Sequence, residues 1–191
     1  IIRSIDGSSA SALCFGCMQF GGAADPGDSS AMFEACREVG VNLFDTAHTY
    51  TGGDAERLLG GFAKAERDKL IIATKAAYTG GSGRANVLRQ FDESRRRLDV
   101  EAVDILYLHR WDADTPLEET FEVPCTLQQS CHIRHIGVSN FSIPKLKTVM
   151  AAAKEIPEMN QVEGHPLLQQ DELFKFCTDN GILITAYSPL G

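Results

Sequence analysis

Residues 41–50 read VNLFDTAHTY, a short apolar run that ends at Asp45 and is followed five residues later by Tyr50. The run Val41 to Phe44 is too short for a stable helix, and its continuous apolar character is typical of a strand that is covered on both faces. Strands of this kind belong to parallel sheets with helices packed against them. Residues 41–45 therefore predict a buried strand with an acidic residue at its carboxyl end.

The same pattern repeats along the chain. The expected strands are Ala12 to Met18, Val41 to Phe44, Leu70 to Thr74, Val103 to Leu108, Ile133 to Val138, Met159 to Val162 and Ile182 to Tyr187. The expected helices between them include Ser29 to Val39, Asp54 to Ala65, Asn86 to Leu98, Lys145 to Glu155 and Asp171 to Asn180. This alternation predicts one α/β domain over residues 1–191, in which parallel strands are joined by crossover helices.

Polar or ionisable residues stand at the ends of nearly all of these runs. They are Asp45, Lys75, His109, Ser139, Asn140, Gln161 and Tyr187. The carboxyl ends of parallel strands lie on one side of the sheet, and in a (β/α)₈ barrel that side is the mouth where active sites are built. Single strand ends are often polar because loops begin there, but a set this mixed in chemistry favours a functional mouth.

Four residues near these ends suggest acid catalysis. A neutral tyrosine is a poor acid at pH 7, since its reference pKa is roughly 10, but a nearby ammonium stabilises the phenolate. Lys75 could supply that charge beside Tyr50, and Asp45 could pair with the lysine, because an unpaired buried charge is costly. His109 could donate a hydrogen bond to a substrate carbonyl oxygen. The set predicts proton donation in a carbonyl reduction, whose hydride must come from a cofactor.

The bulk composition excludes several other classes of protein. The net charge of -8 argues against a nucleic-acid partner, which needs a basic surface, and no apolar run is long enough to span a bilayer. The six cysteines have irregular spacing and are interpreted as reduced thiols of a cytoplasmic protein. Cys14 and Cys17 form a C-x-x-C pair, but no partner pair stands at zinc-ligand spacing, so no metal site is expected.

Six motifs, in order, make the chain resemble the aldo-keto reductase family. They are VNLFDTAHTY at residues 41–50 with ERLLG at 56–60, IIATK at 71–75, VDILYLHR at 103–110, IGVSNF at 136–141, NQVE at 160–163 and TAYSPLG at 185–191. The resemblance covers nearly the whole chain. It implies a (β/α)₈ TIM barrel that is incomplete at the C-terminus, with about seven parallel strands present and no eighth.

The resemblance also implies an activity and a set of site residues. The chain would be an NADP-dependent oxidoreductase that reduces an aldehyde or ketone to an alcohol, with Tyr50 as the proton donor among Asp45, Lys75 and His109. Trp111 would line the substrate mouth, although a packed core aromatic is an equally good interpretation of this residue. The residues expected to bind the cofactor are Gly16, Cys17, Met18, Ser139, Asn140, Gln161, Tyr187, Ser188 and Leu190.

A second interpretation stays open. The family includes non-catalytic members such as potassium-channel β subunits, so a truncated binding or regulatory subunit is the alternative. The complete acid set favours an enzyme, whereas the absence of an eighth strand motif favours the alternative. Hydrolysis on a barrel is a weaker candidate, because the strand ends carry no clear paired carboxylates or metal ligands. The sequence leaves the substrate and the oligomeric state open.

Three local features depart from a plain barrel pattern. Pro124 should break or displace the helix expected over Phe121 to Ser130, because proline lacks an N–H and clashes with the preceding turn. Cys131 stands where the family has a turn glycine, so a left-handed backbone there would be strained. The run Arg95 to Arg97 is expected to lie on a solvated helix face.

Overall fold

The computed structural model describes residues 2–153 and 155–191. They group into two compact units, which are described separately. The first unit comprises Ile1–Ala76 with Leu88–Ile105, and the second comprises Ala77–Val87 with Leu106–Gly191. No helix among the described residues is both long enough and apolar enough to cross a membrane.

Seven strands follow one another in chain order in a single sheet. They are β1 (Cys14–Gly16), β2 (Leu43–Asp45), β3 (Ile71–Ala76), β4 (Val103–Leu108), β5 (Ile133–Ser139), β6 (Met159–Glu163) and β7 (Leu183–Tyr187). Strands β1 to β3 pair in parallel within the first unit, and β5 to β7 do so within the second. The expected seven parallel strands are therefore confirmed for the described residues, although β1 is shorter than predicted.

The strand register brings the predicted polar ends into line. Gly16 of β1 lies opposite Asp45 of β2, and Ser139 of β5 lies opposite Gln161 of β6. Because parallel strands point the same way, these residues stand at matching carboxyl ends of their sheet segments. Each unit thus contributes its own group of strand-end side chains.

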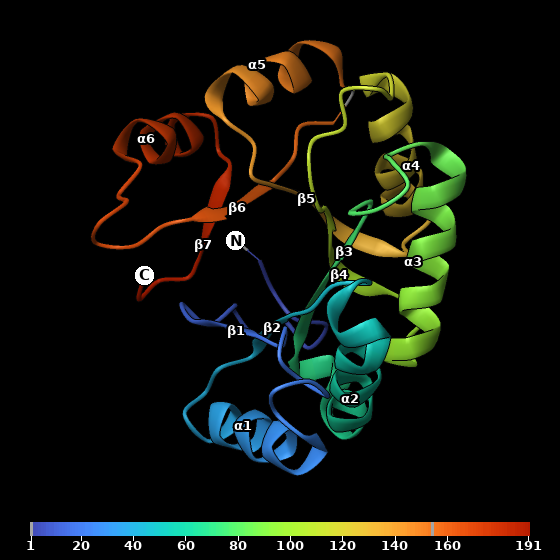
Figure 1. Ribbon diagram of the computed structural model, residues 1–191, viewed down its shortest axis with the longest axis vertical. Coiled ribbons are helices and arrows are strands. Elements are labelled where there is room, and N and C mark those ends of the chain that lie inside the picture. The colour runs from blue at the N-terminus through green and yellow to red at the C-terminus, as the bar shows by residue number, and fades with distance from the viewer. Residues whose placement is uncertain (1, 154) are drawn as a thin grey trace. The chain divides into compact units, whose positions relative to one another are not determined.

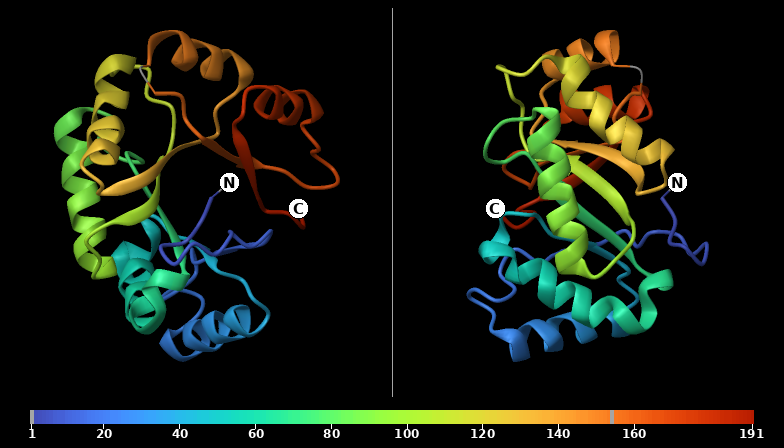
Figure 2. Two further views of the ribbon diagram at one scale, coloured as in Figure 1. Left: turned by 180° about the vertical axis from the view of Figure 1, so that it is seen from behind. Right: turned by 90° about the vertical axis from the view of Figure 1, so that its right-hand side faces the viewer.

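Helices alternate with the strands along the chain (Figure 1). They are α1 (Pro26–Glu38), α2 (Asp54–Ala63), α3 (Arg84–Leu98), α4 (Leu117–Gln129), α5 (Ile143–Ala152) and α6 (Asp171–Asp179), with short 3₁₀ segments η1 (Tyr50–Gly53) and η2 (Lys64–Lys69). In the second unit, α6 lies beside β7 (Figure 2). Glycines follow α1 and α6 with left-handed φ angles, +84° at Gly40 and +72° at Gly181, a conformation that commonly ends a helix.

An aromatic cluster fills the core of the first unit between its helices and β2. The ring of Phe33 from α1 lies 4.8 Å from that of Phe44, centroid to centroid, and 5.7 Å from that of Phe62 on α2. Phe20 completes the cluster by an edge contact with Phe62. Burial of these rings fixes α1 and α2 against β2, the strand that ends in Asp45.

Helix α2 approaches the end of α3 closely at a glycine. A Cβ atom on Gly60 of α2 would lie nearer to the backbone oxygen of Leu98, at the end of α3, than any real contact allows. Gly60→Ala should therefore lower the free energy of unfolding by about 1–3 kcal/mol through overpacking. Gly61→Ala is the matched control, because nothing lies within 4 Å of the added methyl group. Urea denaturation should show a lower midpoint for Gly60→Ala alone, and equal midpoints would refute the contact.

The structure corrects one expectation about α4 and confirms another just beyond it. Helix α4 runs unbroken from Leu117 to Gln129 with Pro124 inside it, so the predicted break is wrong. Pro124 is buried together with Phe121 and Leu127, and burial of this apolar face outweighs the lost hydrogen bond. Cys131 has a φ of +60°, so the backbone at this position is left-handed. Because the residue is not glycine, this conformation is strained, as expected.

Candidate active site

Neighbouring strands of the first unit bring Asp45 and Lys75 together. Asp45 ends β2, and Lys75 is the penultimate residue of β3. The Lys75 side chain is only 1% exposed, and its Nζ is ion-paired with Oδ1 of Asp45. The predicted buried ion pair is therefore present in the structure.

Three acceptors surround the buried ammonium, one for each of its N–H donors. They are Oδ1 of Asp45, the backbone oxygen of Thr46 at 3.0 Å and the hydroxyl oxygen of Tyr50 at 3.2 Å. Burial alone would lower the pKa of Lys75, but attraction to Asp45 and Tyr50 outweighs burial and raises that pKa above its usual value. Lys75 is thus a fixed positive charge at neutral pH.

The Lys75 ammonium contacts Tyr50 both at its hydroxyl group and at its ring. Tyr50 opens the short segment η1 after β2, and the Lys75 ammonium lies 4.8 Å from the centre of its ring. The tyrosine is only half-buried, so its side chain is not closed off from solvent as Lys75 is. A half-buried tyrosine whose hydroxyl contacts a buried ammonium is suited to exchange a proton with a bound molecule.

Backbone hydrogen bonds hold the chain between β2 and Tyr50 along β3. The N–H of Thr46 donates to the oxygen of Ala73 at 2.8 Å, and the N–H of His48 donates to the oxygen of Lys75 at 3.0 Å. The N–H of Tyr50 then donates to the oxygen of Ala47 at 3.1 Å. The position of the tyrosine is therefore coupled to the strand that carries the lysine.

The three residues predicted near the nicotinamide in this unit lie at the end of β1 and directly after it. Gly16 ends β1 opposite Asp45, and the N–H of Cys17 donates to the oxygen of Asp45 at 2.8 Å. The Cys17 side chain is fully buried, whereas Met18 is exposed. Burial raises the pKa of Cys14 and of Cys17, which favours two inert thiols over a reactive C-x-x-C pair.

His109 belongs to the second unit, directly after β4, and its ring packs against an aromatic residue that the sequence pattern did not single out. The ring centres of His109 and Tyr78 are 4.8 Å apart, and the Arg110 guanidinium lies 5.3 Å from the centre of the Tyr78 ring. Tyr78 is exposed and follows Lys75 by only three residues. Its place just beyond a polar strand end is the signal that could have identified it.

Trp111 has aromatic and cationic neighbours within the second unit. Its ring lies 5.3 Å from that of Phe141 in an edge contact, and the Lys145 ammonium lies 5.6 Å from its centre. Trp111 is half-buried. These contacts fit both interpretations of this residue, a packed aromatic and one that lines a mouth.

The cofactor residues predicted on β5, β6 and β7 do come together. Oδ1 of Asn140 accepts a hydrogen bond of 3.0 Å from the Tyr187 hydroxyl, and its Nδ2 donates to Ser139 Oγ at 3.3 Å. The N–H of Asn140 donates to the oxygen of Gln161 at 2.9 Å. Asn140 and Tyr187 line a cavity of about 260 Å³ together with Phe141. Amide groups beside an exposed aromatic ring suit a flat, polar ligand.

The last two predicted residues lie in the turn after β7. Ser188 has a left-handed φ of +48°, and Leu190 is 97% exposed. A larger cavity, of about 750 Å³, lies along α4 and the end of α5 and contains none of the predicted site residues. The ionisable residues that line this larger cavity are Arg84, Glu118, Glu119, Glu122 and Cys125. Among the described residues, no group of three His, Cys, Asp or Glu side chains is arranged to hold a metal ion.

Comparison with known proteins finds relatives that are similar to this chain in sequence. The chain is 30% identical over 203 residues to a probable voltage-gated potassium channel subunit beta of Arabidopsis thaliana, a match that covers 96% of this chain and 61% of the relative. It is 36% identical over 157 residues to the 9,11-endoperoxide prostaglandin H2 reductase of Trypanosoma cruzi, a match that covers 81% of this chain and 54% of the relative. The chain thus spans between about half and two thirds of the length of these relatives.

The chain also matches solved structures and the sequence model of a protein family. An aldo/keto reductase from Klebsiella pneumoniae, solved in complex with NADP and acetate, matches with a TM-score of 0.89 and 29% identity, over 99% of this chain and 68% of that one. The expected fold class, an incomplete (β/α)₈ barrel, is confirmed by this match. The model of the Aldo/keto reductase family matches residues 12–191, and the chain belongs to that family.

Proposed function

We propose that the protein is an NADP-dependent oxidoreductase that reduces an aldehyde or ketone to an alcohol, with Tyr50 as the proton donor. The observation that carries the proposal is the fully buried Lys75 ammonium, ion-paired with Asp45 and 3.2 Å from the Tyr50 hydroxyl oxygen. A buried lysine held charged beside a tyrosine has little structural purpose, because an apolar pair would pack there at lower cost.

Each residue of this group has a separate task in the proposed reaction. Asp45 keeps Lys75 in its charged form, and Lys75 stabilises the negative charge that Tyr50 acquires when it gives up its proton. Tyr50 gives that proton to the substrate oxygen as the carbonyl bond is reduced. His109 is proposed to donate a hydrogen bond to the carbonyl oxygen, with its ring orientation supported by Tyr78.

The second unit fits a nicotinamide group. Ser139, Asn140 and Gln161 offer hydroxyl and amide groups that match a carboxamide, and the exposed ring of Tyr187 offers a surface for stacking. Bound there, NADP in its reduced form supplies the hydride. Relatives from Klebsiella pneumoniae were solved with NADP and with NADPH, which supports this choice of cofactor.

The remaining predicted residues are proposed to complete the two binding regions. Gly16, Cys17 and Met18 would lie near the nicotinamide, with Cys17 contributing backbone rather than its buried side chain. Ser188 and Leu190 would approach the pyrophosphate. Trp111 would line the substrate mouth.

The proposal predicts that the chain consumes NADPH only when a carbonyl compound is present. Purified chain should be mixed with NADPH and a reactive aromatic aldehyde, and the reduced-nicotinamide absorbance followed over time. Aldehyde-dependent loss of absorbance, with matching formation of the alcohol, is the expected result. A chain that binds NADPH, shown by quenching of Trp111 fluorescence, but never turns it over would instead be a non-catalytic binding subunit.

A further inference from the structure

A largely buried arginine contacts the segment that carries Tyr50. Arg97 is on α3, and its side chain is only 11% exposed although it ends a run of three arginines. Its Nη1 donates a hydrogen bond of 2.8 Å to the backbone oxygen of His48. The expectation that this arginine run lies on a solvated face is therefore wrong for Arg97.

The same guanidinium supports the far end of the segment. Gly53 has a φ of +99°, and a Cβ added to it would lie 2.5 Å from Cζ of Arg97. Only glycine allows the backbone to rest this closely on the guanidinium plane. We call residues 48–53 the Tyr50 turn. Arg97 contacts it at its first residue and at its last.

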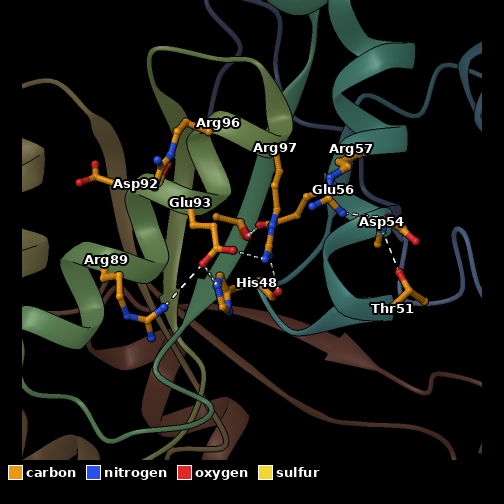
Figure 3. A network of polar contacts seen from close by, with 12 residues as sticks. His48, Thr51, Asp54, Glu56, Arg57, Arg89, Asp92, Glu93, Arg96 and Arg97 are labelled. Carbon is orange, nitrogen blue, oxygen red and sulfur yellow. Dashed lines mark hydrogen bonds and ion pairs between the residues drawn. The ribbon is translucent and has the colours of Figure 1, made fainter.

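Glu56 connects the arginine to the strand that carries the catalytic lysine. Glu56 is fully buried, with Oε2 at 3.1 Å from Arg97 Nη1 and Oε1 accepting a hydrogen bond of 2.7 Å from Thr74, the residue before the lysine. Glu93, one helical turn before Arg97, bonds to the second guanidinium nitrogen and to His48 Nε2 at 3.0 Å. Figure 3 shows how these side chains converge on Arg97 from α2, α3 and the Tyr50 turn.

The other two arginines of the run bond to different groups. Arg95 donates to the backbone oxygen of Glu101 and to Asp92, and Arg96 is exposed and bonds to its own helix at the oxygen of Asp92. Sequence position within the run therefore does not explain the burial of Arg97. Its contacts with Glu56 and the Tyr50 turn do.

We infer that Arg97 is a positioning residue for Tyr50. A buried ion pair adds little net stability compared with packed apolar side chains, but it fixes geometry because each charge demands its partner. The planar fork of arginine holds two groups at set angles, here the carboxylate of Glu56 and the oxygen of His48. The inference rests on the proposed role of Tyr50 as the acid, because a fixed turn keeps its hydroxyl on the lysine ammonium.

Arg97→Lys tests the inference, with Arg96→Lys as the matched control. Lysine keeps the positive charge but cannot hold both acceptors in one plane. Turnover of aldehyde should fall about 10- to 100-fold, as expected for a small misplacement of a catalytic group, with KM nearly unchanged. Amide hydrogen exchange at His48 and Tyr50 should become faster, while β3 stays protected. Arg96→Lys should change neither readout.

The two readouts separate failure of this inference from failure of the proposed function. If Arg97→Lys left exchange in the Tyr50 turn and turnover at the level of Arg96→Lys, the inference would be overturned. It would also be overturned if turnover fell with no change of exchange in the turn. If the turn loosened but Tyr50→Phe left reduction intact, Arg97 would still position the turn and the proposed role of Tyr50 would be wrong.

A double variant removes the buried charges together. Arg97→Met alone would leave Glu56 buried without its cation, which weakens the whole fold. Arg97→Met combined with Glu56→Gln avoids that, since glutamine can still accept the Thr74 hydrogen bond through its Oε1. We expect faster exchange at His48 in this variant at near-normal thermal stability. Normal exchange there would contradict the positioning role.

Discussion

Tyr50→Phe is expected to lower kcat/KM for carbonyl reduction by about 10² or more. The substitution keeps the ring beside the Lys75 ammonium and removes only the proton that would reach the substrate oxygen. A loss of that size corresponds to about 3 kcal/mol of transition-state stabilisation. Cofactor affinity should hardly change, because Tyr50 is not among the residues proposed to bind the nicotinamide. Steady-state rates with an aromatic aldehyde, together with NADPH binding by fluorescence, provide the measurement.

Tyr107→Phe is the matched control for this substitution. Tyr107 is fully buried in β4. Its hydroxyl makes a weak contact of 3.7 Å with the sulfur of Met159. Removal of that hydroxyl should leave reduction at the wild-type rate. Near-normal turnover by a folded, cofactor-binding Tyr50→Phe variant would show that another group supplies the proton.

Lys75→Met should abolish most activity and also destabilise the fold. Without the ammonium, Asp45 is left as a buried carboxylate lacking its cation, which costs about 3–5 kcal/mol in comparable cases. Reduction should fall by a factor similar to that of Tyr50→Phe, since the tyrosine loses the charge that stabilises its ionised form. Adding Asp45→Asn should restore much of the stability but none of the activity. Urea denaturation and aldehyde turnover measure the two effects separately.

Lys64→Met controls for the loss of a lysine ion pair as such. Lys64 pairs with Asp99 at 2.7 Å, but both side chains are largely exposed, so this pair should contribute little. A stability loss for Lys75→Met no larger than that for Lys64→Met would mean that the buried pair does not form in solution.

The pH dependence of stability follows from the same pair. The folded pKa of Lys75 is raised, so the contribution of the pair is fully present below the ordinary pKa of lysine and is lost as the pH rises through the higher folded value. The free energy of unfolding of the wild-type protein should therefore exceed that of Lys75→Met throughout the neutral range. The difference should disappear only in strongly alkaline buffer.

The group around Lys75 is predictable from sequence because strand order determines it. Asp45 ends β2 and Lys75 is the penultimate residue of β3, and the parallel register places Asp45 opposite Ala73, two residues before the lysine. Tyr50 follows on the same loop. Strand order thus predicts that Lys75 and Asp45 lie close together, whereas the contact of Lys75 with Tyr50 is expected from the chemistry of a tyrosine acid; the structure contains both.

The environment of Arg97 is not predictable in this way. Its burial depends on how α3 packs on α2, where Gly60 lets the helices approach, and on a glycine turn that exposes backbone to the guanidinium. The local sequence of an arginine run on an amphipathic helix does not predict these contacts. The prediction at Pro124 is wrong for a related reason. The free-energy cost of proline in a helix can be read from the local sequence, whereas the burial that offsets this cost depends on tertiary packing.

The most direct test of the central claim is deuterium transfer. The chain should be incubated with an aromatic aldehyde and NADPH deuterated at its transferable position, and the alcohol analysed by mass spectrometry. The account predicts one deuterium on the former carbonyl carbon with wild-type chain, and about 10²-fold less labelled alcohol with Tyr50→Phe at equal cofactor occupancy. Labelled alcohol in equal amounts from both proteins, or none above the protein-free control from the wild type, would contradict it.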